Sequence, residues 1–208
     1  MLEPFKHILQ TQRIVLASGS PRRKEVLNNI GLNFEVVPST YEENLDPANY
    51  PNPADFVIDT AAHKVEEVFE RLNKDPVKPN FIIGADTVVV FENEIYGKPK
   101  SEEHAFEMLR KFCGKSQFVY TGIVLKTQRD TVKFFEKSEV EFGELTDEMI
   151  KAYVNTGEPM DKAGGYGIQS IGGTLVKSVR GDYFNIVGFP VYHFCKQLVD
   201  LLQKNQND

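Results

Sequence analysis

The sequence predicts an α/β protein, a single domain with a mixed, twisted sheet flanked by helices. Two observations lead to this fold class. An apolar run over 13–17 stops at small polar residues, and a helical pattern starts directly afterwards at Pro21. Further along, the segments 117–126 and 132–142 have the composition of strands and are joined by a short polar connection. Helical crossovers and a hairpin therefore contribute to one sheet.

The amino-terminal part alternates strands with helices. After the strand 13–17, a helix runs from Pro21 to about residue 29, where Gly31 follows as a stop signal. The segment 33–38 is a second strand, followed by a polar loop that we expect at the surface. Asn52 and Pro53 then provide a cap and a first residue for a long helix, whose apolar residues recur every three or four positions.

The middle of the chain contains an apolar, β-branched run over 81–91 that predicts a central strand, although Gly84 and Asp86 interrupt it. Polar residues then turn the chain towards Ile95. Ser101 caps the next helix, which Gly114 ends.

The carboxy-terminal part begins with a helix that Thr146 opens and that ends before Gly157. The segment 158–173 holds five glycines among charged and amide residues, and we expect no packed element in it. A strand over 174–179 and an amphipathic helix over 189–203 complete the chain.

Composition excludes several classes of protein. Of the 208 residues, 41% are hydrophobic and 26% are charged, which is typical of a globular domain with a full core. The net charge of −6 argues against nucleic-acid binding. No apolar stretch reaches the roughly 18 to 20 residues that cross a bilayer, and the amino terminus does not resemble a secretory signal. We therefore expect a cytoplasmic protein with no nucleic-acid or membrane partner.

Four groups of residues have side chains suited to chemistry. The first is Ser18, Ser20, Arg22 and Arg23, at a turn from strand to helix, where helix amides and guanidinium groups would converge on an anion such as phosphate. A solvated first turn with hydroxyl caps explains the same spacing equally well.

The second group surrounds Asp86, in the order Gly84-Ala85-Asp86-Thr87. Burying an unpaired carboxylate costs several kcal/mol. We therefore expect Asp86 at a strand end that faces a pocket, where it binds a metal or activates water, or else caps a nearby helix. Glu42, in the preceding acidic loop, is a candidate second ligand for a divalent cation, although such a residue is more often a surface charge.

The third group is a pair of lysines. Lys64 lies on the long helix, and Lys98 stands in a rigid Gly-Lys-Pro bend. Each can direct its charge at a phosphate, but an isolated lysine usually faces solvent.

The fourth group is the glycine-rich segment from Asp161 to Gln169. Glycine lets the main chain approach a flat ligand, and the amide of Gln169 both donates and accepts hydrogen bonds. These properties suit one wall of a base-binding site, whereas the alternative is a flexible loop.

Taken together, these groups resemble the Maf family of nucleoside triphosphate pyrophosphatases. The resemblance extends over 13–202, which implies a domain with these bounds and tails at 1–12 and 203–208. The final segment is similar to the form found in the subgroup acting on dTTP and UTP. The matching blocks, in chain order, are Ser18-Gly-Ser20-Pro-Arg22-Arg23, Glu42, Lys64, Gly84-Ala-Asp86-Thr87, Lys98-Pro99 and Asp161-Lys-Ala-Gly-Gly-Tyr-Gly-Ile-Gln169.

The resemblance implies hydrolysis between the α- and β-phosphates, which yields a nucleoside monophosphate and pyrophosphate with the help of Mg²⁺ or Mn²⁺. It implies that Asp86 accepts a proton, that Glu42 and Asp86 bind the metal, and that Pro21, Thr87 and Gln169 set the choice of base. It also implies a Maf/inosine-triphosphatase-like fold with a cleft between two lobes, and a homodimer. The substrate-binding residues that it implies are Ser18, Arg22, Arg23, Lys64, Lys98, Asp161, Lys162 and Gln169.

A triphosphate carries about four negative charges, so an acidic protein needs a local cluster of cations to bind one. Two other functions remain open at this point: a regulatory module that binds nucleotide without turnover, and a scaffold that binds none. The physiological substrate of an enzyme of this kind can be a normal or a modified pyrimidine nucleotide.

Overall fold

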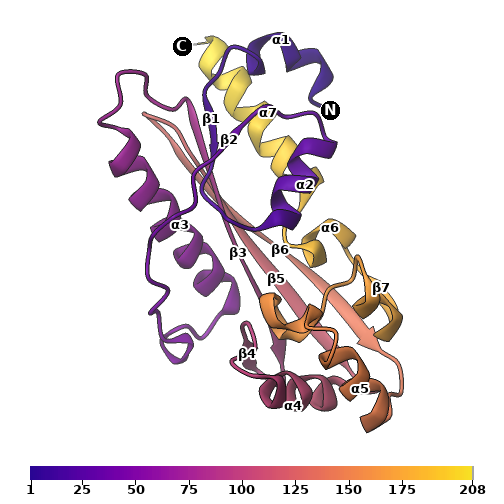
Figure 1. The fold of residues 1–208 in the computed structure, drawn as a ribbon. Coiled ribbons are helices and arrows are strands. Elements are labelled where there is room, and N and C mark those ends of the chain that lie inside the picture. The colour runs from indigo at the N-terminus through magenta and orange to yellow at the C-terminus, as the bar shows by residue number, and fades with distance from the viewer. Residues whose placement is uncertain (208) are drawn as a thin grey trace. The chain divides into compact units, whose positions relative to one another are not determined.

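The computed structural model describes residues 1–207 and contains a seven-stranded mixed sheet in the order β2-β1-β3-β5-β6-β7, with β4 paired to β3 (Figure 1). β1 pairs in parallel with β2 and β3, whereas β4 on β3 and β7 on β6 are antiparallel. The predicted α/β class with a mixed sheet flanked by helices is confirmed. The strands are β1 (Ile14–Leu16), β2 (Glu35–Val36), β3 (Phe81–Phe91), β4 (Glu94–Tyr96), β5 (Ser116–Lys126), β6 (Thr131–Phe142) and β7 (Val176–Arg180).

The chain divides into two compact units. The first contains residues 1–86, 122–135 and the segment from Gly188 onwards, and the second contains Thr87–Thr121 and Glu136–Val187.

The first unit holds α1 (Lys6–Leu9), α2 (Pro21–Asn29), α3 (Pro53–Leu72) and α7 (Val191–Asn207). The apolar face of α3 packs on β1 and β3, and Val65 and Ile82 are both buried in this cluster. Gly84 permits the contact, because a Cβ atom there would lie 2.3 Å from Cγ2 of Val65. The glycine that interrupts the predicted central strand is thus explained by the close approach of α3.

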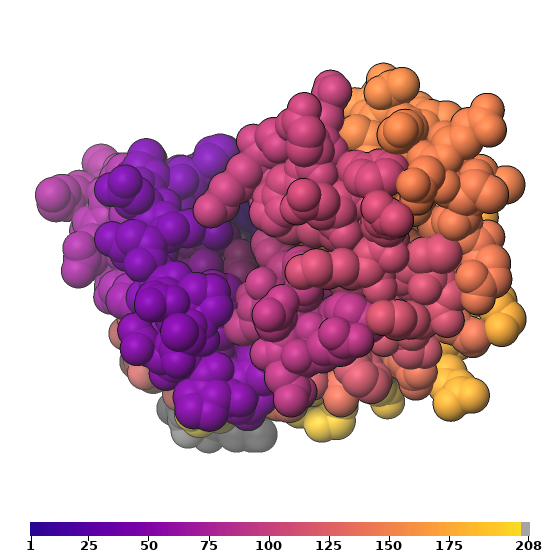
Figure 2. All heavy atoms as spheres, turned by 90° about the horizontal axis from the view of Figure 1, so that it is seen from below, coloured from indigo at the N-terminus to yellow at the C-terminus, as the bar shows by residue number. Residues whose placement is uncertain are grey.

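The polar loop between β2 and α3 lies at the surface, as its composition predicts. It contains the short 3₁₀ helix η2 (Pro47–Asn49) and belongs to the indigo and purple part of the surface in Figure 2. The strand before this loop is shorter than the predicted 33–38, since only Glu35 and Val36 pair with β1.

The second unit contains α4 (Glu102–Phe112), α5 (Asp147–Val154) and α6 (Tyr183–Val187). The centre of its core is Phe112, which is fully buried and makes edge-to-face contacts with three aromatic rings. The predicted caps of both longer helices are present: Ser101 Oγ accepts from the amide of His104, and Thr146 Oγ1 accepts from the amide of Met149.

The expectation that 158–173 holds no packed element is wrong. Three short 3₁₀ helices start within this segment: η3 (Glu158–Asp161), η4 (Ala163–Gly165) and η5 (Ile171–Leu175). Tyr166 is 5% exposed, and its ring centroid lies 4.8 Å from that of Phe142. Single turns leave no apolar periodicity in a sequence, so the pattern used to identify helices could not find them.

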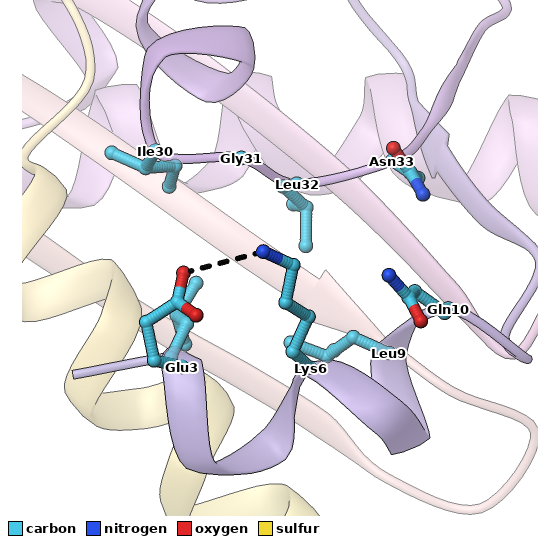
Figure 3. A pocket seen from close by; sticks show the side chains of 9 residues that line it. Glu3, Lys6, Leu9, Gln10, Ile30, Gly31, Leu32 and Asn33 are labelled. Atoms are coloured by element: carbon cyan, nitrogen blue, oxygen red, sulfur yellow. Dashed lines mark ion pairs between the residues drawn. The ribbon is translucent and has the colours of Figure 1, made fainter.

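The segment before β1 contains two short helices. Residues 3–9 form η1 (Glu3–Phe5) and α1, and Leu9 is buried. A shallow pocket lies between these helices and the segment after α2, and Lys6 pairs with Glu3 at its edge, at 3.6 Å (Figure 3). The lining of this pocket includes none of the predicted site residues. At the other end α7 continues to Asn207, and residue 208 lies outside the described residues.

Both cysteines are free. Among residues 1–207, no helix has the length and apolar character needed to cross a bilayer.

Candidate functional site

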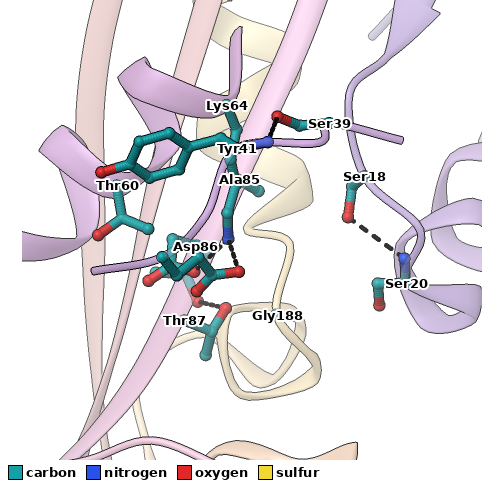
Figure 4. Close-up of polar contacts among 12 residues, drawn as sticks. Ser18, Ser20, Ser39, Tyr41, Thr60, Lys64, Ala85, Asp86, Thr87 and Gly188 are labelled. Atoms are coloured by element: carbon teal, nitrogen blue, oxygen red, sulfur yellow. Dashed lines mark hydrogen bonds and ion pairs between the residues drawn. The ribbon is translucent and has the colours of Figure 1, made fainter. Parts of the chain in front are cut away.

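Asp86 lies in the interior of β3, 8% exposed, and not at the strand end where it was predicted. The Nζ atom of Lys64, on α3, lies 2.8 Å from Oδ1 of Asp86 (Figure 4). The prediction assumed an unpaired carboxylate, but the ammonium group offsets part of the desolvation cost and makes an interior position possible. Lys64 thus directs its charge at a buried carboxylate.

Burial raises the pKa of Asp86 above its ordinary value, and Glu43 acts in the same direction. The charges of Lys64 and Arg23 oppose this shift without cancelling it. A carboxylate with a raised pKa accepts a proton more readily than an exposed aspartate, which is the property that a general base needs near neutral pH.

A second carboxylate contacts the same ammonium group. Oε1 of Glu43 lies 2.9 Å from Nζ of Lys64, so Asp86 and Glu43 converge on one cation. Glu42, the predicted second ligand, is an exposed neighbour of Glu43. The sequence signal was the adjacent pair of glutamates, and it does not say which of the two turns towards α3.

The loop that carries Glu43 is attached to α3 by Glu67. Oε2 of Glu67 accepts hydrogen bonds from Ser39 Oγ at 2.8 Å and from the amide of Thr40 at 2.9 Å. Burial favours a higher pKa, but these hydrogen bonds and the charge of Arg71 outweigh it and hold the pKa of Glu67 below its usual value. The ring of Tyr41 also stacks on His63 of α3, with centroids 4.9 Å apart. Helix α3 thus carries Lys64 and also holds the loop that carries Glu43.

Arg23 hydrogen-bonds to three separate parts of the first unit. Its Nη1 donates to the carbonyl of Ala85 at 2.9 Å and to Ser18 Oγ at 3.1 Å, while Nε donates to the carbonyl of Gly188 at 3.0 Å. Burial lowers the pKa of this guanidinium. Arg23 therefore joins the turn after β1 to β3 beside Asp86 and adds a positive charge close to that carboxylate.

The amino terminus of α2 differs from those of α3, α4 and α5. Asn52, Ser101 and Thr146 each cap their helix through a side-chain oxygen. Ser20, in the described structure, makes no such bond, and its own amide donates to Ser18 Oγ at 3.3 Å. The first turn of α2, with Pro21 and the partly exposed Arg22, therefore leaves amide groups that no N-cap side chain occupies.

The remaining predicted site residues belong to the second unit. Lys98 and Gln169 are exposed. Nζ of Lys162 donates to Asp161 Oδ1 and to the carbonyl of Glu158, both at 2.6 Å. Thr87 shares a hydrogen bond of 3.0 Å with the buried Thr121.

Across residues 1–207, no cluster of three or more His, Cys, Asp or Glu side chains could enclose an ion. However, Mg²⁺ usually takes only one or two carboxylates from a protein and completes its shell with water and phosphate oxygens. Asp86 and Glu43 approach the same ammonium group, and two neighbouring carboxylates have the donor chemistry for an ion that shares its coordination with a substrate.

Two relatives align with most of this chain. A human protein described as a probable bifunctional dTTP/UTP pyrophosphatase/methyltransferase is 49% identical over 199 residues, which cover 91% of this chain but only 32% of the human protein. A Bacillus cereus dTTP/UTP pyrophosphatase is 44% identical over 187 residues, covering 90% of this chain and 94% of the bacterial one. The Ham1 protein of Staphylococcus aureus aligns with a TM-score of 0.45 and 18% identity over 63% of this chain and 72% of its own.

The chain thus spans about a third of the human relative and nearly all of the bacterial one. The family model described as Maf-like protein matches residues 13–201. This match establishes that the chain belongs to the Maf-like protein family.

Proposed function

We propose that the chain hydrolyses dTTP and UTP to the nucleoside monophosphate and pyrophosphate. The observation that carries the proposal is the buried carboxylate of Asp86, with a raised pKa, beside the ammonium of Lys64. The names of the human and Bacillus cereus relatives support the same activity and the same pair of substrates.

In the proposed reaction, a water oxygen attacks the α-phosphorus, and the bond from that phosphorus to the bridging oxygen breaks. The bonding electron pair leaves with pyrophosphate, and the water proton passes to the carboxylate of Asp86. The first turn of α2, with Ser18, Arg22, Arg23, Lys64 and Lys98, supplies the donors and positive charge that the phosphates require.

Mg²⁺ or Mn²⁺ fits this scheme, with Asp86 as one protein ligand. Glu43 is the better candidate for the second ligand than Glu42, because Glu43 contacts the ammonium that Asp86 also contacts. When bound, the ion neutralises charge on the phosphate oxygens.

The two glutamates provide a matched pair of variants. Glu43→Gln should raise the Mg²⁺ concentration for half-maximal activity about tenfold, whereas Glu42→Gln should leave it within about twofold. A metal titration at saturating UTP distinguishes them. The reverse order would restore Glu42 as the ligand.

We assign recognition of the base to Gln169, and we propose that Pro21 and Thr87 also contribute to the choice of base. The exposed amide of Gln169 can pair with the alternating acceptors and donor of a uracil or thymine edge. Asp161 and Lys162 form an ion pair in the same glycine-rich segment and are proposed to contact the substrate there. The family resemblance also leads us to propose a homodimer.

The direct test is a panel of normal and modified nucleoside triphosphates with Mg²⁺ or Mn²⁺, scored for monophosphate and pyrophosphate. We expect turnover of dTTP and UTP, and Asp86→Asn should lower kcat by about 100-fold or more while nucleotide still binds. Release of orthophosphate would contradict the assigned bond. Saturable binding without turnover would favour the regulatory module, and an absence of binding would favour the scaffold.

A further inference from the structure

The two ends of the segment that carries Gln169 are attached to the same pair of side chains. At its start, the amide of Gly167 donates to the hydroxyl of Tyr153 at 3.2 Å. At its end, the amides of Ile171 and Gly172 donate to the carboxylate of Glu158 at 3.2 Å and 2.9 Å. The exposed residues Gln169 and Ser170 lie between these two attachments.

Tyr153 and Glu158 are themselves linked, because the hydroxyl of Tyr153 donates to Glu158 Oε1 at 3.0 Å. Tyr153 comes from α5, is 3% exposed and packs in the core of the second unit. Burial raises the pKa of Tyr153, and the charge of Glu158 adds to this effect. The phenol therefore keeps its proton and remains a donor to Glu158 while it accepts from Gly167.

The glycines of this segment leave little room for another arrangement. A Cβ atom on Gly172 would lie 2.5 Å from the hydroxyl of Tyr153 and 2.7 Å from the carbonyl oxygen of Gly167. The backbones at the two ends therefore meet over the tyrosine, and only a residue without a side chain fits at that point. The result is a short closed loop, 167–172, with fixed ends and an exposed tip.

We propose that Glu158 and Tyr153 are positioning residues for base selection, which fix the two ends of the loop 167–172 so that Gln169 presents its amide in one orientation. This inference rests on the proposed function, in which Gln169 pairs with the base. The physical reason is preorganisation: an amide on a mobile loop loses conformational entropy on every binding event, whereas one on a fixed loop has already lost it.

Neither residue belongs to the set that the family resemblance implied, and each acts through the backbone of the loop. Loss of either one should therefore weaken base recognition and leave the chemical step nearly unchanged. A uracil-type base should be affected most, because its imide edge needs the amide of Gln169 in a defined orientation to form two hydrogen bonds.

Two variants test the proposal: Tyr153→Phe, which removes one hydroxyl, and Glu158→Gln, which removes the negative charge and one of the two carboxylate oxygens. The control is Glu148→Gln, an exposed acid on the same helix α5. For each protein we would measure hydrogen exchange at the amides of Gly167, Ile171 and Gly172, and kcat and KM for UTP and CTP.

We expect exchange at these amides to accelerate about tenfold in both variants, which corresponds to about 1.4 kcal/mol of lost protection. The KM for UTP should rise about fivefold to tenfold and the preference for UTP over CTP should shrink, while kcat for UTP stays within about twofold. The control should match the wild type. Should Glu158→Gln unfold, Tyr153→Phe carries the test by itself.

Faster exchange with unchanged UTP/CTP selectivity would overturn the inference, since the contacts would then be structural only. Unchanged exchange would overturn it as well. A wild-type protein that does not turn over UTP or prefer it to CTP would instead refute the proposed function, and this result appears before any variant is compared.

Discussion

The two units place functional groups by different means. In the first unit, Asp86 and Lys64 stand on a strand and a long helix, and their opposite charges hold them together at 2.8 Å. In the second unit, Gln169 stands on a short loop, and the carboxylate of Glu158 binds backbone amides of that loop. The position of the functional groups depends on an ion pair between side chains in the first unit, and on the backbone conformation of a loop in the second.

The difference teaches which kind of substitution each region tolerates. A strand or helix keeps its backbone conformation when one side chain changes, so a substitution around Asp86 acts mainly through charge. A glycine-rich loop lacks the regular hydrogen bonds of a strand or helix, so a single added methyl group can change its backbone conformation. We therefore expect changes in the first unit to lower kcat, and changes in the second to alter stability and selectivity.

The largest effect should come from Lys64→Met. This change leaves Asp86 buried without its ammonium partner, which should cost about 3 kcal/mol of unfolding free energy and lower kcat by about 100-fold or more. Urea denaturation and steady-state kinetics measure the two effects. Lys74→Met, at an exposed position after α3, serves as the control. Wild-type kcat in Lys64→Met would show that charge is not the essential feature of the first unit.

Gly172→Ala should have the next largest effect. The added Cβ atom would lie 2.5 Å from the Tyr153 hydroxyl, and overpacking of this kind typically costs about 2 kcal/mol. We expect a lower midpoint of urea denaturation and a higher KM for UTP. At Gly143 the nearest atom to an added Cβ is 3.9 Å away, so Gly143→Ala is the matched control. Equal stability of the two variants would mean that the loop adapts, contrary to the proposed contrast.

The smallest effect should be that of Gln169→Ala, because its side chain is exposed. Stability should stay within about 0.5 kcal/mol of the wild type. The preference for UTP over CTP should fall about tenfold, the value of a bidentate amide contact. Competition between the two nucleotides measures this directly. Retention of the wild-type ratio would remove Gln169 from base recognition.

Much of the fold was predictable because its signals are local. The strand predicted over 81–91 has the bounds of β3, since a continuous apolar and β-branched run marks its whole length. Asn52 and Ser101 were identified as helix caps, because a cap depends on a few adjacent residues. The short α6 was not predicted, since five residues are too few for a helical period to show.

The candidate site was predictable in its residue types but not in its pairs. Asp86 and Lys64 were each found as chemistry-bearing residues, yet their ion pair joins positions 22 residues apart and depends on the packing of α3 on β3. The sequence pointed to Glu42 as the second acidic residue, and the structure directs Glu43 towards the ammonium. Glu158 did not stand out, because its backbone partners become its neighbours only after the loop folds.

The sequence by itself therefore determined the order of the strands and the longer helices, the mixed α/β class and the motifs that match the Maf-like family. Periodicity, caps and motif spacing are properties of neighbouring residues and need no knowledge of packing. Only the tertiary structure decided which carboxylates share the Lys64 ammonium and which carboxylate closes the loop around Gln169. Charge pairing and hydrogen bonding act over a few ångströms in space, and packing alone brings distant parts of the chain within that range.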